Sequence, residues 1–445
     1  MPIQTEVPGI SKSLSSKNAD AAALGVLVKM SARKRFFIRA VEVIARPCVV
    51  VLERVRRTPK NVVGEVKKIL VMEYWNLGDI VMLSPFLKSL RMQYSNACIT
   101  LLTSPKAAPL LEHQGLVDQV IVVRVPWAQH YSRWRKYNPF SVSWLEFLRT
   151  LKLLRRQKFD LAFTVRADIR DNFILWLSKV RRRVGYGFGG GAFLLTDSAT
   201  PDLEHPHLSV RWLGLLKHLG NFALVQQPSL QVTEEEDQHA EQYLAALGVR
   251  DREFLVGVHP GARNAMRQWG DANFAALAQR LQSQFPIRVL WFQDPAQETT
   301  SLNGCQVLPL ALPLRQFMGV LKRCQLLICN DSGPMHIATA LGVPVVAIFG
   351  PTEPAWFGPL GPNNRVVIQA GFWCRPCFDY CRFDEPYCMR VITVDSVYGA
   401  AAEALTALMQ SGKDGEIVSP TSSQIMSIAE MVSPRVLGQR SSFHD

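Results

Sequence analysis

The chain has 445 residues, and 48% of them are hydrophobic, which is enough to build cores and excludes wholesale disorder. Its length suits two domains of ordinary size. The formal net charge of +13 implies an acidic partner, such as a nucleic acid, an anionic lipid or a phosphorylated substrate.

The positive charge is concentrated near the N-terminus. Residues 1–68 contain 14 Lys and Arg against five Asp and Glu, so +9 of the net +13 lies there and +4 in the rest of the chain. Between residues 21 and 57 apolar and basic residues interleave, without the roughly 20 apolar residues of a spanning helix or the order of a signal peptide. We therefore predict a basic amphipathic extension over residues 1–65. Such a stretch lies on an anionic membrane surface, packs on the protein's own body or forms an unattached arm.

From residue 66 onward, short apolar runs alternate with amphipathic stretches. The runs are rich in β-branched residues and predict strands, and the amphipathic stretches predict helices. The predicted strands of the first half are residues 68–72, 98–102, 120–125 and 159–165. One predicted helix starts after residue 79, and the other two span residues 105–113 and 171–180. This alternation is typical of a parallel sheet with crossover helices.

The second half repeats the same logic after a capping box at Thr233, which opens a helix that ends at Gly248. The predicted strands are residues 254–259, 287–292, 326–330 and 343–349, and the predicted helices are 271–285 and 333–341. We predict two α/β domains, 66–225 and 226–412, that face a cleft at the carboxyl ends of their sheets, where ligands bind in such folds. Residues 413–445 lose the periodicity and are predicted to form a flexible tail.

The first candidate site is Gly78-Asp79, between the first predicted strand and its helix. Gly78 permits a tight turn. Asp79 is either the N-cap of the helix or a general base whose carboxylate points into the cleft.

The second candidate site is the segment 330–336, which reads Asn-Asp-Ser-Gly-Pro-Met-His between a strand and a helix. Ser332 and Gly333 offer backbone N–H groups at a helix N-terminus, where anions bind, and His336 falls one turn further on. Asp331 would repel a diphosphate, so it either contacts sugar hydroxyls or caps the helix, in which case His336 is a packed or solvated histidine.

Two basic groups complete the candidate sites. Arg263 and Arg267 follow the strand at 254–259 and are suited to bidentate phosphate contacts, unless they are simply solvated. A further basic group lies among aromatic residues and either receives a phosphorylated acceptor or forms a solvated loop. Its members are Arg133, Arg135 and Lys136.

Four cysteines near the end of the second half have the spacing C-x2-C-x3-C-x6-C; they are Cys374, Cys377, Cys381 and Cys388. Four thiolates can bind zinc tetrahedrally, but this spacing is tighter than in zinc ribbons. We therefore favour ordinary buried or redox-active thiols over a zinc site. No Asp-x-Asp pair occurs in the chain, so the usual device for holding a metal-bound diphosphate is absent from the sequence.

Taken in order, these segments resemble glycosyltransferase family 9, which contains the ADP-heptose:lipopolysaccharide heptosyltransferases. The matching stretches are residues 78–85, 259–269, 330–338 and 350–354, together with the cysteine segment. The resemblance runs from about residue 66 to about residue 405. It implies the GT-B fold, in which two Rossmann-like domains face a cleft, and an inverting sugar transfer that requires no metal or cofactor.

The resemblance also implies roles for individual residues. Asp79 would deprotonate the acceptor hydroxyl, with Gly78 beside it on the acceptor side. Asp331 would contact the donor sugar. The donor diphosphate would meet Ser332, Gly333, His336 and Arg267, with Arg263 as a weaker candidate.

The substrates and the location follow from the same resemblance. The donor would be a nucleotide-diphosphate sugar, by default ADP-heptose, and the acceptor a lipopolysaccharide core or a related lipid-linked glycan. The enzyme would be cytoplasmic and peripheral on the inner membrane. The alternatives are a nucleotide-sugar epimerase or hydrolase of GT-B fold, or a basic nucleic-acid-binding protein. The chain has no recognition motif of the latter class, so nucleic acid is not expected as a partner.

Overall fold

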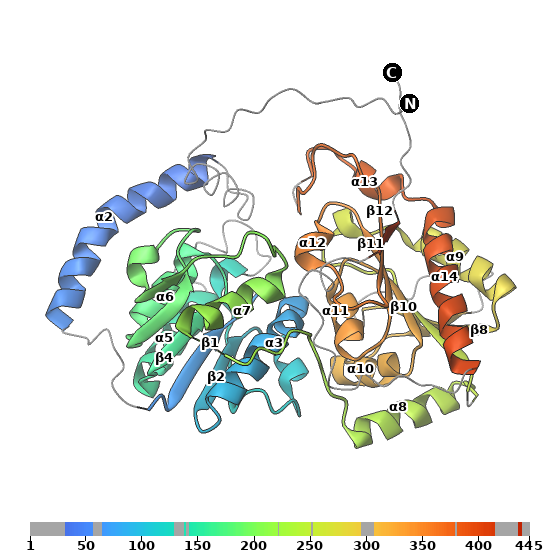
Figure 1. The fold of residues 1–445 in the computed structure, drawn as a ribbon, viewed down its shortest axis with the longest axis horizontal. Helices are drawn as coiled ribbons and strands as arrows, with labels where there is room; N and C mark the ends of the chain where they lie inside the picture. The colour runs from blue at the N-terminus through green and yellow to red at the C-terminus, as the bar shows by residue number, and fades with distance from the viewer. Residues whose placement is uncertain are drawn as a thin grey trace, which may run out of the picture.

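The computed structural model describes residues 32–56, 65–128, 138, 142–220, 222–250, 252–294, 307–378, 381–413 and 435–437. Two α/β halves lie side by side, and each is built around a parallel sheet (Figure 1).

The first sheet has six strands in the order β3-β2-β1-β4-β5-β6. The strands are β1 (Lys68–Met72), β2 (Cys98–Thr103), β3 (Gln119–Val122), β4 (Leu161–Thr164), β5 (Arg182–Tyr186) and β6 (Asp197–Ala199). Both neighbours of β1 are parallel to it, with Leu70 opposite Thr100 and Ala162. The central strands are mostly apolar and buried, as in parallel sheets whose two faces are both covered by helices.

The second sheet has seven strands in the order β13-β12-β11-β10-β7-β8-β9. The strands are β7 (Phe254–His259), β8 (Ile287–Phe292), β9 (Val307–Leu310), β10 (Leu326–Asn330), β11 (Val345–Phe349), β12 (Arg365–Ile368) and β13 (Arg435–Leu437). All their pairings are parallel, so the predicted pair of Rossmann-like parallel sheets is confirmed.

The helices of the first half are α2 (Ala32–Arg56), α3 (Leu77–Gln93), α5 (Val142–Gln157), α6 (Ile169–Leu177) and α7 (Leu208–Leu219), with the 3-10 turns η1 (Ala108–Leu111), η2 (Pro126–Ala128) and η3 (Ala192–Leu194). Those of the second half are α8 (Glu234–Ala246), η4 (Ala265–Arg267), α9 (Asp271–Gln284), α10 (Leu314–Lys322), α11 (Gly333–Ala340), α12 (Pro354–Phe357), α13 (Tyr387–Arg390) and α14 (Val394–Lys413).

One predicted helix is wrong. Residues 105–113 form only the 3-10 turn η1. Pro109 lacks the N–H that a longer helix needs, and His113 has a φ of 59°, outside the helical region. Within the predicted tail, Arg435–Leu437 lies as strand β13 beside β12, while residues 414–434 and 438–445 lie outside the described part of the chain.

The basic extension contains a long helix, α2, that lies along the outer edge of the first half (Figure 1). The Glu42 side chain accepts a hydrogen bond from Gly191 N (2.7 Å), and the Glu53 side chain accepts one from Trp176 Nε1 (2.8 Å). Val49 is buried against Trp176 in a small apolar cluster. One face of the predicted amphipathic extension therefore packs on the protein's own body; residues 1–31 and 57–64 lie outside the description.

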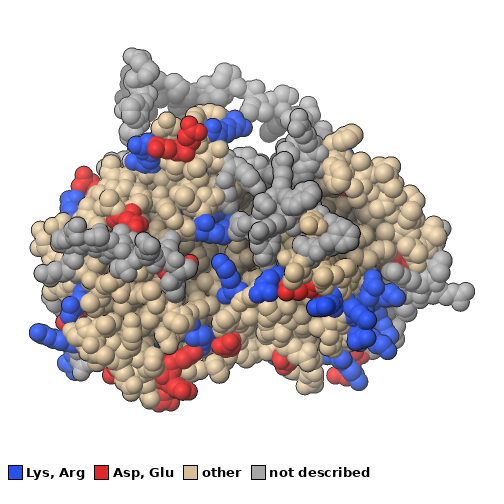
Figure 2. Space-filling view, turned by 180° about the vertical axis from the view of Figure 1, so that it is seen from behind, with Lys and Arg blue, Asp and Glu red and all other residues tan. Residues whose placement is uncertain are grey.

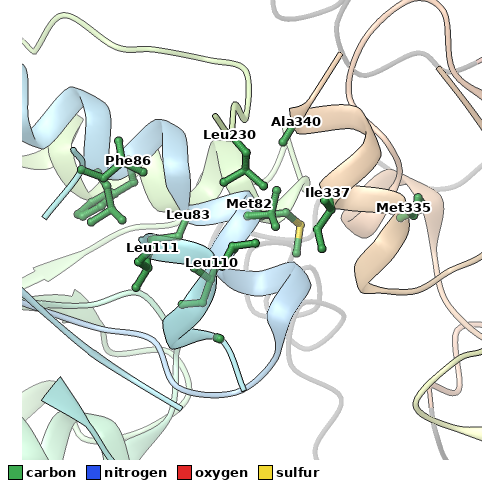
Figure 3. Close-up of a cluster of buried hydrophobic side chains, with 14 of the residues drawn as sticks. Met82, Leu83, Phe86, Leu110, Leu111, Leu230, Met335, Ile337 and Ala340 are labelled. Carbon is green, nitrogen blue, oxygen red and sulfur yellow. The ribbon is translucent and has the colours of Figure 1, made fainter. Parts of the chain in front are cut away.

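The two halves share one hydrophobic core at their junction (Figure 3). Met82 of α3 lies against Ile337 of α11, and Leu230 of the connecting segment lies close to both (Figure 3). A hydrogen bond also joins the two halves: Nε2 of the buried His207, just before α7, lies 3.1 Å from Gly358 O in the second half. The junction is therefore a packed interface beneath the site.

The segment that connects the two halves is hydrogen-bonded to a helix of each half. Val225 N donates to Ser89 Oγ of α3 (2.8 Å), and Leu230 N donates to Ala340 O at the end of α11 (2.9 Å). The predicted domain boundary at residue 225 falls in this segment. Within the described part of the chain, every helix is too short or too polar to cross a membrane.

Candidate active site

Two helices begin side by side where the two halves meet. Helix α3 starts shortly after β1, and helix α11 starts shortly after β10. A Cβ placed on Gly78 would lie 2.7 Å from His336 Cδ2, and one placed on Gly333 would lie 3.3 Å from Leu77 Cδ2. Glycine at 78 and 333 therefore lets the helix N-termini approach, and their dipoles favour negative charge between them.

Asp79 is the third residue of α3 and not its N-cap. The N-cap is Asn76, which makes no side-chain capping bond, so the capping interpretation of Asp79 is wrong. Asp79 is buried, with 5% of the residue exposed. Its carboxylate accepts a hydrogen bond from Asn76 Nδ2 (2.8 Å) and forms an ion pair with Arg166 Nη2 (2.5 Å). A carboxylate fixed in this way at the junction has the placement of a general base.

Sequence reasoning missed the partner of Asp79. Arg166 follows β4, and its Nε donates to Glu73 Oε2 (2.8 Å) at the end of β1. One guanidinium thus joins two buried carboxylates. Glu73 and Arg166 follow the neighbouring strands β1 and β4 and therefore meet at the same sheet edge, which the sequence could not show because it does not give the strand order.

Near this group lies a third buried acid, Asp171 of α6. Its carboxylate accepts a hydrogen bond from Tyr74 Oη. Burial, reinforced by the charge of Asp168, raises the pKa of Asp171 to about 8. The guanidinium of Arg170 lies over the Trp75 ring at 5.8 Å and the Trp127 ring at 5.6 Å, so aromatic surface and charge line the same side.

On the second half, Asp331 holds Arg267 in place. Arg267 Nη1 donates to Asp331 Oδ2 (3.0 Å), and Thr352 Oγ1 donates to the same oxygen (2.6 Å). The N-cap of α11 is Ser332, so Asp331 does not cap the helix. The structure thus gives Asp331 a contact that the sequence did not suggest, with the predicted phosphate-binding arginine. Thr352 was also missed; it lies three residues after the end of strand β11.

Ser332 does not cap α11 with its side chain. Its hydroxyl donates back to Asn330 O (3.1 Å) instead. Backbone N–H groups at such a terminus bind phosphate.

His336 lies between the two halves. It is buried, and burial lowers its pKa to about 4; the charge of Asp79 acts in the opposite direction and that of Arg267 in the same one. The ring is therefore neutral at physiological pH. The ring packs against Gly78, so the packed-histidine interpretation agrees with the geometry. The ring also lies close enough to Asp79 and Arg267 for their charges to act on it.

Arg263 connects the two halves through Asn76. Its Nη1 donates to Asn76 Oδ1, and Asn76 donates in turn to Asp79. The loop after β7 thus reaches the helix that carries Asp79. On the face seen in Figure 2, Lys and Arg side chains gather along the junction of the halves.

The remaining predicted residues are the basic group and the four cysteines. Arg133, Arg135 and Lys136 lie outside the described residues. In the described ranges no three His, Cys, Asp or Glu side chains are arranged to hold a metal ion, the cysteines near residue 380 included. Cys388 is buried, and burial together with the neighbouring Cys377 raises its pKa to about 11, which keeps it a thiol.

The comparison with known families decides what this site belongs to. The model of glycosyltransferase family 9 (heptosyltransferase) matches residues 147–387, more than half of the chain. The protein belongs to glycosyltransferase family 9. It is therefore a glycosyltransferase.

The individual relatives agree with this assignment. Lipopolysaccharide heptosyltransferase 2 of Escherichia coli (strain K12) is 26% identical over 322 residues, which cover 67% of this chain and 87% of that protein. A glycosyl transferase family 9 structure from Veillonella parvula DSM 2008 has a TM-score of 0.60 at 21% identity and covers 77% of this chain and 99% of its own. The structure of E. coli ADP-heptose lps heptosyltransferase II has a TM-score of 0.58 at 22% identity, with 78% and 99% covered. The predicted GT-B architecture is confirmed by these folds.

The buried acid near the site yields a prediction about stability and pH. With a folded pKa of about 8 against an ordinary value of 3.8, folded Asp171 holds its proton across a range in which the unfolded chain releases it. Wild-type stability contributed by this group is therefore present at low pH and is lost as the pH rises toward 8. Asp171→Asn removes that loss. Between pH 5 and pH 8 the free energy of unfolding of the variant should therefore rise by more than about 1 kcal/mol relative to that of the wild type.

Urea unfolding at the two pH values measures the difference. Asp395 is exposed, so Asp395→Asn serves as the matched control. It should change the free energy of unfolding by the same amount at both pH values. An Asp171→Asn difference that does not change with pH would contradict the buried neutral acid.

Proposed function

We propose that this glycosyltransferase moves a heptose from ADP-heptose to the core of lipopolysaccharide or to a related lipid-linked glycan. The observation that carries the proposal is the placement of Asp79, held by Arg166 and Asn76 on one half, opposite the start of α11 and Arg267 on the other. The names of the relatives support the heptose, the ADP and the core acceptor.

The donor is assigned to the second half. The diphosphate meets the backbone N–H groups at the start of α11 and the guanidinium of Arg267, which Asp331 and Thr352 orient. This arrangement stabilises the negative charge that develops on the leaving nucleoside diphosphate. The reaction then needs no resident metal or cofactor.

The acceptor is assigned to the first half, and the reaction is an in-line displacement. Asp79 accepts the proton of the acceptor hydroxyl while its oxygen forms a bond to the anomeric carbon. The bond from that carbon to the phosphate oxygen breaks, and its electron pair leaves with the nucleoside diphosphate. The configuration at the anomeric carbon is inverted.

Replacing the base tests this mechanism. Asp79→Asn keeps the size and the Asn76 contact but cannot accept the proton, so kcat for transfer should fall about 10² to 10⁴-fold while donor affinity is retained. ADP release from ADP-heptose with a lipopolysaccharide-core acceptor measures kcat, and calorimetry measures donor affinity. The exposed Asp384→Asn is the control and should match wild type.

Transfer at the wild-type rate by Asp79→Asn would contradict the assignment of the base. Formation of a free sugar by the wild type without any acceptor would contradict transfer and indicate an epimerase or hydrolase.

We further propose that the enzyme works on the cytoplasmic face of the inner membrane, bound through α2. The outward face of α2 carries large apolar side chains that are more than half exposed: Phe36, Phe37, Val43, Ile44 and Val51. Exposed Arg39 and Arg46 lie on the same helix, as in helices that bind anionic lipid. The inward face is fastened to the body, so a membrane bound there would hold the acceptor-binding half near the lipid.

A single substitution tests the membrane contact. Ile44→Asp places a charge where an apolar side chain would enter the bilayer, and binding to vesicles of anionic phospholipid should fall about tenfold or more. Vesicle sedimentation measures the bound fraction. Leu247→Asp, an exposed apolar position in the second half, is the control and should bind as wild type. Equal binding by all three proteins would refute the role of α2.

A further inference from the structure

The junction contains a charged group that the proposed reaction leaves unexplained. Glu73 lies at the end of β1 and is 1% exposed, so its charge has no access to bulk water. Its Oε1 accepts from Trp75 N (2.9 Å), and its Oε2 accepts from Arg166 Nε (2.8 Å). Burying a carboxylate costs free energy, so a glutamate kept here needs a reason that packing does not supply.

Arg166 divides its charge between two acids. Its Nε bonds to Glu73, and its Nη2 forms the ion pair with Asp79. The guanidinium lies over the Trp75 ring at 5.3 Å, which restricts its movement. Asp79 and Glu73 therefore compete for one cation inside the protein, where charges interact strongly.

We propose that Glu73 and Arg166 are positioning residues that make Asp79 an effective proton acceptor. The proposal rests on the base role of Asp79 in the proposed function. When Asp79 accepts the acceptor proton, its carboxylate becomes neutral and its ion pair with Arg166 is lost. Glu73 then retains the guanidinium as its own partner, so this partly buried cation is never left without an anion beside it. Glu73 in this way offsets the energetic cost of neutralising Asp79.

The ionisation of Glu73 gives this arrangement a dependence on pH. Burial raises the pKa of Glu73 to about 7, opposed by Arg166 and reinforced by Asp79. Below that pH the neutral Glu73 leaves Arg166 to Asp79 alone; above it the anion draws the guanidinium away and leaves Asp79 the stronger acceptor. The charged and titratable groups around this site include Arg166 after β4, Asp79 on α3, Asp171 on α6, the cation of Arg211 on α7 and, from the second half, His336 on α11.

The test is the pH dependence of transfer. Wild-type kcat should rise through an ionisation near pH 7. In Glu73→Gln that ionisation should disappear, and kcat at pH 8 should fall about tenfold with donor affinity unchanged. Glu73→Asp retains a carboxylate and should keep the ionisation. Glu112→Gln, exposed on the same half, is the matched control and should follow wild type.

The outcomes separate this proposal from the one on which it rests. If Asp79→Asn is inactive while Glu73→Gln has the wild-type profile, only the role of Glu73 is overturned. If Asp79→Asn is active, both fall. Should Glu73→Gln fail to fold, the wild-type profile still decides, because a kcat that does not change between pH 6 and pH 8 overturns the proposal.

Discussion

The apolar contact between α3 and α11 is the constraint on which the site depends. Buried side chains of both helices and of the connecting segment form one core across the junction (Figure 3). The contact is close because Gly78 faces the His336 ring and Gly333 faces Leu77. It brings two helix N-termini together. One helix follows a strand of the first sheet, and the other follows a strand of the second sheet.

From this contact the division of labour follows. The first half presents Asp79 within a group of buried charges, and the second presents Arg267 fixed by Asp331. In the proposed reaction neither set is complete alone, because the acceptor hydroxyl and the leaving phosphate lie on opposite sides of one carbon. The packed junction holds the two sets on facing sides of the contact, and positioning of reacting groups contributes to catalysis.

Much of this was predictable from the sequence, for identifiable reasons. Apolar β-branched runs are buried strands in both halves, and the segment 330–336 does lie at a helix start beside the predicted Arg267. The capping interpretation of Asp79 failed because spacing alone does not say where the helix begins, which is at Leu77. Contacts between distant segments were also invisible: Arg166 to Asp79, Thr352 to Asp331 and Glu53 to Trp176 each need the strand order that only the fold supplies.

A crystal structure of the protein with a bound nucleotide-diphosphate sugar tests the central claim most directly. The account predicts diphosphate oxygens within about 3.2 Å of backbone N–H groups at the start of α11, with Arg267 beside them. The anomeric carbon should face Asp79, with room for one hydroxyl between them. A diphosphate bound on the first half, or a sugar directed away from Asp79, would contradict the account.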